Sequence, residues 1–193
     1  MNSTSRLTDS TQKPLRTAPI KTSNLVAGIP FGMSSAYMGL FDMFKKREPS
    51  PNDNLLVGVQ NDDPALCRAA LQAGAEPNIQ LNIAGAPGVI PIYWASGKGH
   101  ARAVKALIDG GGMVNYRNPN IPNHQSNLKF AILYDQIDVV EVLLNAGANP
   151  DIGWDGETPL TFLKRRSTII GRSPIQRAGD EKMIRLLEAK GAK

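Results

Sequence analysis

The sequence has little of what a secreted or membrane-spanning protein needs. Cys67 is the one cysteine among 193 residues, so no disulfide can form within the chain and a disulfide-rich secreted scaffold is excluded. The most apolar stretch, residues 25–44, is interrupted by glycine, proline, serine and Asp42, and is not a transmembrane segment. Residues 1–23 lack the apolar block of a signal peptide. We therefore expect a cytoplasmic protein without an integral membrane segment.

The excess of positive charge is confined to the start of the chain. The net charge is +5, and residues 1–50 hold seven basic and three acidic side chains, which leaves fifteen basic and fourteen acidic ones in residues 51–193. A nucleic-acid binder usually has a basic face that neutralises several phosphates. The nearly neutral body therefore argues against a nucleic-acid partner.

Charge is also segregated along the body. Residues 130–163 contain six carboxylates and no Lys or Arg, whereas residues 164–179 contain five basic side chains and no carboxylate. The simpler interpretation is that the two neighbouring surfaces pair with each other or are solvated. The alternative is a patch that faces a partner.

Similar small-residue strings recur in four segments of the body, which read LQAGAEPN (71–78), IDGGGMVN (108–115), LNAGANPD (144–151) and EAKGA (188–192). Apolar residues precede each string at spacings of three and four, which predicts a helix with one apolar face. The glycine of each string is expected to end that helix in the left-handed conformation. An earlier helix is expected to begin in each segment, near Asp53, Ile90, Ser126 and Thr158, with Asp53, Ser126 and Thr158 as N-caps.

This arrangement resembles an ankyrin-repeat protein. The resemblance is carried by TPL at 158–160, its weaker versions IPI at 90–92 and SNL at 126–128, Gly99 with His100, and the GA pairs at 74, 147 and 191. It implies an all-α solenoid of helix-turn-helix units with long connecting fingers over residues 52–193. The expected units lie at about 53–85, 90–122, 126–154 and 158–193.

Insertions distinguish this chain from an ideal repeat. The glycines at 74, 111, 147 and 191 lie 37, 36 and 44 residues apart, against about 33 in an ideal ankyrin unit. Two insertions fall at 79–89 and 116–125, whose Pro, Gly and Asn content predicts exposed fingers without strands. The third is expected as a basic segment between the last two helices, at 167–178. Glu188 stands where earlier units have an apolar residue, which predicts a C-terminal cap and a complete four-unit stack.

The first fifty residues are expected to be organised differently. Residues 1–32 have the composition of a disordered tail. Residues 33–48 are predicted to form a short amphipathic helix that caps the first unit, and the alternative is weak attachment to a membrane surface. The string MGLFDMFKKR from Met38 is typical of a bacterial translation start, which leaves open whether residues 1–37 belong to the native protein.

Few residues could carry catalysis or bind a metal. His100 is expected to pack at a turn between helices and His124 lies in a finger, and neither has a second ligand at metal-binding spacing. Cys67 is predicted to be buried on the apolar face of a helix. The glycine-rich segments 97–99 and 110–112 do not match a phosphate-binding loop. We therefore predict no enzyme activity, no cofactor and no metal.

The resemblance implies a monomeric module that binds a partner protein through a concave face made by the fingers and the first helices. Tyr, Trp and Arg are enriched at interface hot spots. The predicted contact residues are Lys98, Tyr116, Arg117, Tyr134, Trp154, Glu157, Arg165 and Arg166. Val57, Trp94, Phe130 and Phe162 occupy the same position in the four units and form a column. Their main predicted role is packing between repeats, and contact with a partner is a secondary one.

Three alternatives remain open for the function. Two are subsets of protein binding, namely a secreted bacterial effector directed at a host and an immunity or inhibitor protein for a toxin. The third belongs to another class, a regulatory subunit with an activity in the basic insert 167–178.

Overall fold

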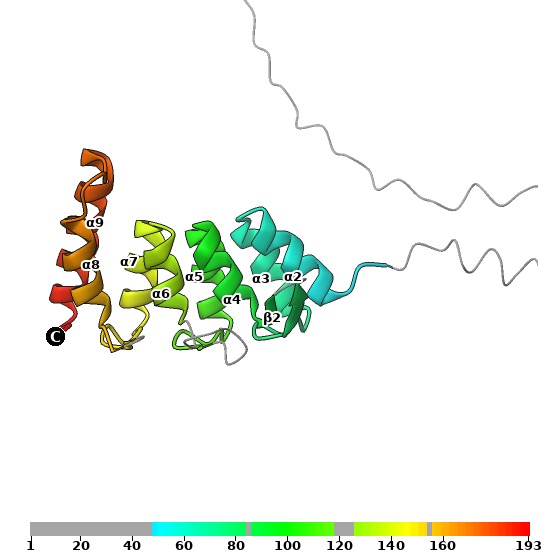
Figure 1. The fold of residues 1–193 in the computed structure, drawn as a ribbon. Coiled ribbons are helices and arrows are strands. Elements are labelled where there is room, and N and C mark those ends of the chain that lie inside the picture. The colour runs from blue at the N-terminus through cyan, green and yellow to red at the C-terminus, as the bar shows by residue number, and fades with distance from the viewer. Residues whose placement is uncertain (1–47, 84–85, 118–125, 154–155) are drawn as a thin grey trace, which may run out of the picture. The chain divides into compact units, whose positions relative to one another are not determined.

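The computed structural model describes residues 48–83, 86–117, 126–153 and 156–193 (Figure 1). The chain divides into two units, Met1–Arg47 and Glu48–Lys193, and only the second is described here. The tail predicted over residues 1–32 lies outside the described residues. Of the helix predicted over residues 33–48, only Glu48 is described, and it is not helical.

Eight helices in the described residues form four helix-turn-helix pairs. They are α2 (Pro51–Gln60) with α3 (Pro64–Gln72), α4 (Pro91–Lys98) with α5 (Ala101–Asp109), α6 (Asn127–Leu133) with α7 (Ile137–Asn145), and α8 (Pro159–Ser167) with α9 (Pro174–Ala189). The pairs stand side by side in chain order (Figure 1). The second helices α3, α5, α7 and α9 pack on one another in one row, and the first helices form the other row. The predicted all-α solenoid is confirmed.

Local sequence signals start the first helices. The hydroxyl groups of Ser126 and Thr158 accept the N–H groups of Lys129 at 3.1 Å and Thr161 at 3.3 Å, and thereby cap α6 and α8 as predicted. The prediction of Asp53 as an N-cap is wrong, because α2 begins after Ser50. Asp53 is the third helical residue and completes a capping box with Ser50.

The same turn ends the second helix of every pair. Its glycine has a φ angle of 95°, 91°, 87° and 82° at Gly74, Gly111, Gly147 and Gly191. The residue after each glycine donates its N–H to a carbonyl near the end of the helix, as Ala75 does to Ala70 at 2.9 Å. The predicted left-handed glycine stops are confirmed, since glycine adopts a positive φ at little cost.

A repeated side-chain hydrogen bond joins each turn to the next. Asn78 accepts the N–H of Met113 at 2.8 Å and donates to the carbonyl of Gly111 at 3.0 Å. Two later residues repeat the acceptor bond at 2.8 Å, Asn115 with the N–H of Asn149 and Asp151 with the N–H of Lys193. The fourth helix pair is therefore attached by the same kind of bond as the pairs before it.

The first finger contains a β-hairpin, contrary to the prediction of a finger without strands. Strands β1 (Leu81–Ile83) and β2 (Ala86–Val89) pair in antiparallel register, with Leu81 opposite Val89. β-Branched residues favour extended backbone, and a two-stranded ribbon has only edges, where proline is tolerated. In the second finger, Arg117 forms an isolated bridge with Ser126, and residues 118–125 lie outside the described part.

The third insertion differs from its predicted form. It was expected as a segment between two helices at 167–178, but only residues 168–173 separate α8 from α9. The rest lengthens α9 to sixteen residues. The signal is local and was missed: Ser173 and Gln176 form a capping box around Pro174, the first residue of α9.

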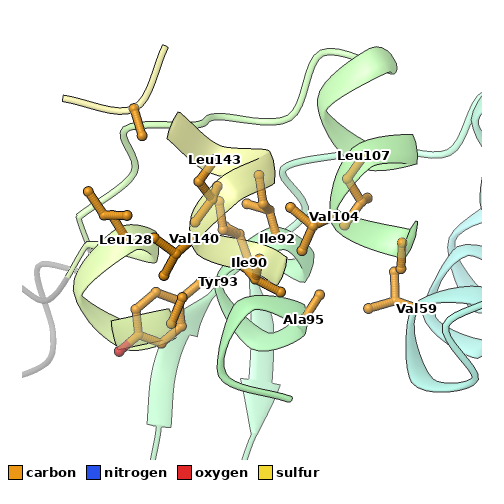
Figure 2. Packing of buried hydrophobic residues seen from close by; sticks show 14 of the residues in the cluster. Val59, Ile90, Ile92, Tyr93, Ala95, Val104, Leu107, Leu128, Val140 and Leu143 are labelled. Atoms are coloured by element: carbon orange, nitrogen blue, oxygen red, sulfur yellow. The ribbon is translucent and has the colours of Figure 1, made fainter. Parts of the chain in front are cut away.

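Buried apolar residues from all four pairs form one cluster between the two rows. Figure 2 shows Ile92, Val104, Val140 and Leu143 meeting between the second and third pairs. Cys67 is 0% exposed, which confirms its predicted burial, and this burial raises the pKa of its thiol to about 11. No helix in the described residues combines the length and apolarity that crossing a bilayer requires.

Candidate protein-binding surface

The first helices α2, α4, α6 and α8 carry the predicted column of Val57, Trp94, Phe130 and Phe162. The three aromatic members are partly buried and pack against the core, which confirms their predicted packing role. Val57 is 45% exposed, so the prediction of a core residue is wrong there. Phe130 packs against the preceding helix pair, and α2 has no preceding pair among the described residues.

Tyr134 is exposed but held in a defined orientation. The Phe130 ring stacks on Tyr93, with centroids 4.4 Å apart and planes 11° apart. Tyr134 meets Phe130 edge-on at 4.8 Å and 69°, and remains 57% exposed. Such aromatic pairs are favourable beyond the area that they bury. An exposed ring that is already ordered loses little conformational entropy when a partner covers it.

Tyr116 connects the two fingers. Its hydroxyl donates to the carbonyl of Gly88 in β2, and its ring meets Tyr93 edge-on at 6.3 Å. Burial raises the pKa of Tyr116, and it raises the pKa of Tyr93 to about 12. Tyr116 is therefore a half-buried positioning residue. Arg117, the next residue, is exposed at the base of the second finger.

Cationic side chains flank the aromatic residues. Lys98 is exposed, and its ammonium lies 5.6 Å from the centre of the Trp94 ring. Arg165 donates two hydrogen bonds of 2.9 Å to the two carboxylate oxygens of Glu157. These bonds lower the pKa of Glu157 and keep the carboxylate charged. Two predicted contact residues thus form one bidentate pair on the surface.

Arg166 is not available to a partner, contrary to the prediction. The residue is 7% exposed, and its guanidinium donates to the carbonyl of Ile132 at 2.9 Å and lies 2.8 Å from Asp135. It also pairs with Asp180, which is 0% exposed. Arg172 lies 2.8 Å from Asp180 and 3.2 Å from Asp135. We name Arg166, Arg172, Asp135 and Asp180 the ion-pair cluster.

The ion-pair cluster decides between the two interpretations of the segregated charge. Asp135 of the acidic stretch pairs with Arg166 and Arg172 of the basic stretch. Glu157, also from the acidic stretch, pairs with Arg165 of the basic one. The simpler interpretation, that neighbouring surfaces pair with each other, is therefore confirmed for these residues. Sequence reasoning missed Asp180, which belongs to neither stretch.

Of the remaining candidates, His100 is partly buried in the fold, and His124 and Trp154 lie outside the described residues. His100 lies at the turn before α5, as predicted; its Nδ1 is 2.7 Å from the carbonyl of Val59, and its ring meets Trp94 edge-on. Within the ranges that the structure describes, no group of three His, Cys, Asp or Glu side chains could hold a metal ion.

The comparisons with known proteins agree with this architecture. A family model for ankyrin repeats, in three copies, matches residues 55–153. Since this is just over half of the sequence, the chain belongs to the ankyrin-repeat family. E3 ubiquitin-protein ligase hecd-1 of Caenorhabditis elegans is 32% identical over 114 residues, which cover 58% of this chain and 4% of that protein. The chain thus spans a small part of this relative, and the similarity concerns the repeats.

Proposed function

We propose that residues 52–193 form a four-unit ankyrin domain that binds a partner protein and is not an enzyme. The fourth helix pair lies after the residues that the family model matches. Its assignment as a fourth unit is supported by the hydrogen bond of 2.8 Å between Asp151 and the N–H of Lys193, which repeats those of the earlier pairs. Repeats of this kind are stable through contacts with their neighbours.

The binding face is made by the first helices and the fingers. The observation that supports it most is Tyr134, a ring 57% exposed and fixed by Phe130. Lys98 and the Arg165–Glu157 pair stand on the same row of first helices. Tyr and Arg anchors surrounded by polar side chains are typical of interface hot spots.

The proposed contact set is smaller than the sequence suggested. It contains Lys98, Tyr134, Glu157 and Arg165, with Arg117 from the second finger and Trp154 from the connection that precedes α8 in the sequence. Tyr116 is left out of this set because it positions the fingers. Arg166 is left out because its guanidinium pairs with the buried Asp180. We further propose a cytoplasmic monomer. A single buried thiol in place of disulfides supports the cytoplasmic location.

A double substitution tests the face. Lys98→Ala combined with Tyr134→Ala should reduce partner capture from a lysate of the source cells at least about tenfold, since losing a hot-spot side chain costs about 2 kcal/mol or more. Quantitative mass spectrometry of the captured proteins is the measurement. The matched control is Glu141→Ala with Lys182→Ala, two exposed residues of α7 and α9 in the row of second helices.

Thermal unfolding separates a binding defect from a folding defect. Both double variants should unfold within a few degrees of the unaltered chain, because all four side chains are exposed. Capture that is unchanged in the Lys98→Ala, Tyr134→Ala variant would reject this face.

A further inference from the structure

The fourth helix pair carries an extension that the first three pairs lack. In those pairs the turn between the helices lies twelve residues before the glycine stop, at Asp62, Gly99 and Asp135, with φ angles of 50°, 79° and 58°. The equivalent residue of the fourth pair is Gly179, which lies inside α9. The turn has moved to residues 168–173, and α9 continues past its neighbours. Figure 1 shows this end standing beyond the ends of the other pairs, at the edge opposite the fingers.

The base of the extension is fixed. Arg172 connects the 168–173 segment to Asp135 of the third pair at 3.2 Å and to Asp180 of α9 at 2.8 Å. Its side chain is 14% exposed. The hydroxyl of Thr168 donates to the carbonyl of Arg165 at 2.8 Å, and the capping box of Ser173 fixes the start of α9. A segment held in this way loses little entropy on binding.

Three isoleucines lie exposed on this fixed segment. Ile169, Ile170 and Ile175 are 47%, 97% and 85% exposed. The other exposed large hydrophobic residues of the described chain are spread over α2, the turn after α5 and the end of α6, namely Val57, Met113, Leu133 and Tyr134. A cluster of apolar side chains in solvent contributes little to the fold and is typical of an interaction surface.

The charge of the segment points to the kind of partner. Residues 164–179 contain no carboxylate. Arg177 is exposed in α9, two residues after Ile175, and has no ion pair with any described residue. Positions i and i+2 lie on different sides of a helix, so Arg177 stands across the tip of α9 from Ile175. A cation at the edge of an apolar tip fits a surface in which carboxylates border an apolar pocket.

We propose that residues 168–178 form a second docking surface for a partner protein. Ile170 and Ile175 insert into an apolar pocket of that partner, and the Arg177 guanidinium pairs with a carboxylate at the pocket rim. The surface lies at the edge opposite the fingers (Figure 1) and borders the face of the first helices at Arg165, whose carbonyl accepts the hydroxyl of Thr168.

A lipid surface fits these observations less well. Each basic residue near an anionic membrane contributes about 1 kcal/mol, and several are needed for stable attachment. Arg172 is already paired with Asp135 and Asp180. Among the described residues of 168–178, this leaves Arg177 as the cation that could face lipid.

A second copy of this chain also fits less well. Its second-helix row has a groove of about 300 Å³ between α3, α5 and α7. That groove is lined by one carboxylate and three basic side chains, Arg68, Arg102 and Lys105. Its carboxylate, Asp109, is already paired with Lys105 at 3.1 Å, so the groove has no unpaired carboxylate for Arg177.

Photo-cross-linking tests the proposal in the full chain. The photoreactive amino acid p-benzoylphenylalanine replaces Ile170, the protein is made in its source cells, and mass spectrometry identifies the cross-linked peptide. We expect a peptide with apolar residues next to Asp or Glu. The yield should fall at least about tenfold when Ile175→Ser and Arg177→Ser are added, because anchors at the centre of an interface carry most of its energy.

The controls use positions with matched exposure. The same photoreactive residue in place of Glu141, on the row of second helices, should not cross-link to that peptide. The Ile175→Ser, Arg177→Ser variant should keep the unfolding temperature of the unaltered chain, since both side chains are exposed. An absent cross-link, a cross-link to a basic peptide, or a yield that the double variant leaves unchanged would each overturn the proposal.

Two further measurements address the other occupants. The protein should stay in the supernatant when phosphatidylcholine vesicles containing phosphatidylserine are sedimented, and it should sediment alone as a monomer in the ultracentrifuge. Vesicle binding that Ile170→Ser abolishes would show that the segment binds lipid instead. A dimer that Ile170→Ser dissociates would show that it binds a second copy.

Discussion

The first helices of the second and third pairs meet through aromatic rings, whereas those of the third and fourth pairs meet through charges, beside an apolar core that all four pairs share. At the first of these junctions the Phe130 ring stacks on Tyr93 and lies over Gly97, where a Cβ atom would overlap it. At the second junction Arg166 and Asp180 are buried as an ion pair, together with apolar side chains such as Leu163 and Met183. Both junctions nevertheless keep the glycine stop and the hydrogen bond between successive turns.

The difference shows that the backbone of this stack does not dictate the chemistry of its interfaces. Glycine turns and turn-to-turn hydrogen bonds set the spacing, and either rings or ion pairs can fill the space. The consequences for stability differ. An apolar junction loses energy in proportion to the atoms removed, whereas a buried ion pair fails when one partner is removed, because the other charge stays buried without compensation.

The largest effect should come from Asp180→Ala. This carboxylate is 0% exposed and pairs with both Arg166 and Arg172. Its removal leaves two guanidinium groups together with only Asp135, whose side chain is 41% exposed. We expect the free energy of unfolding, measured by urea titration, to fall by about 3–5 kcal/mol.

The neighbouring residue provides the control for that substitution. Glu181 is 64% exposed and its ion pair with Arg185 spans 4.0 Å, so Glu181→Ala should change the free energy of unfolding by less than about 0.5 kcal/mol. Equal urea midpoints for Asp180→Ala and the unaltered chain would mean that the charges do not hold the fourth pair.

A smaller effect is expected at the aromatic junction. Gly97→Ala places a Cβ atom against Cε1 and Cδ1 of Phe130, so the ring must move, at a cost of about 1–3 kcal/mol in the free energy of unfolding. In a Phe130→Ala background the overlap is gone, and alanine is better than glycine in a helix by about 1 kcal/mol. The same substitution should then stabilise the protein.

This change of sign is the test of the aromatic junction. A double-mutant cycle, again from urea titrations, gives the coupling between the two positions. If Gly97→Ala destabilises both backgrounds equally, the glycine is required by the helix and not by the Phe130 ring.

Features fixed by neighbouring residues could be predicted from the sequence. The glycine stops, the hydroxyl caps of α6 and α8, and the burial of Cys67 depend on local conformation or on helical periodicity. Tyr134 and Lys98 could be assigned to one face, because equivalent positions recur every 36 or 37 residues. The hairpin in the first finger was missed, since its Pro and Gly content argued for a loop and outweighed the strand-forming residues.

Features that depend on a distant partner could not be predicted. Arg166 occupies the repeat position of Tyr134 and Lys98, yet it is buried because Asp180, fourteen residues later, faces it from α9. The Glu157–Arg165 pair spans eight residues and the start of α8, so no helical spacing indicated it.

The smallest effect is expected on the rate at which the Cys67 thiol is labelled in the Asp180→Ala variant. This rate shows whether a change at the charged junction reaches the first helix pair. Cys67 lies in α3, and burial raises the pKa of its thiol to about 11. Because the folded chain holds this proton more tightly than the unfolded chain, labelling by Ellman's reagent at pH 8 requires α3 to open. If Asp180→Ala opens only the fourth pair, Cys67 should be labelled at the rate of the unaltered chain, while amide hydrogen exchange in α9 becomes faster. Labelling that accelerates together with exchange in α9 would show that the four pairs unfold as one unit, and that both junctions contribute to a single cooperative transition.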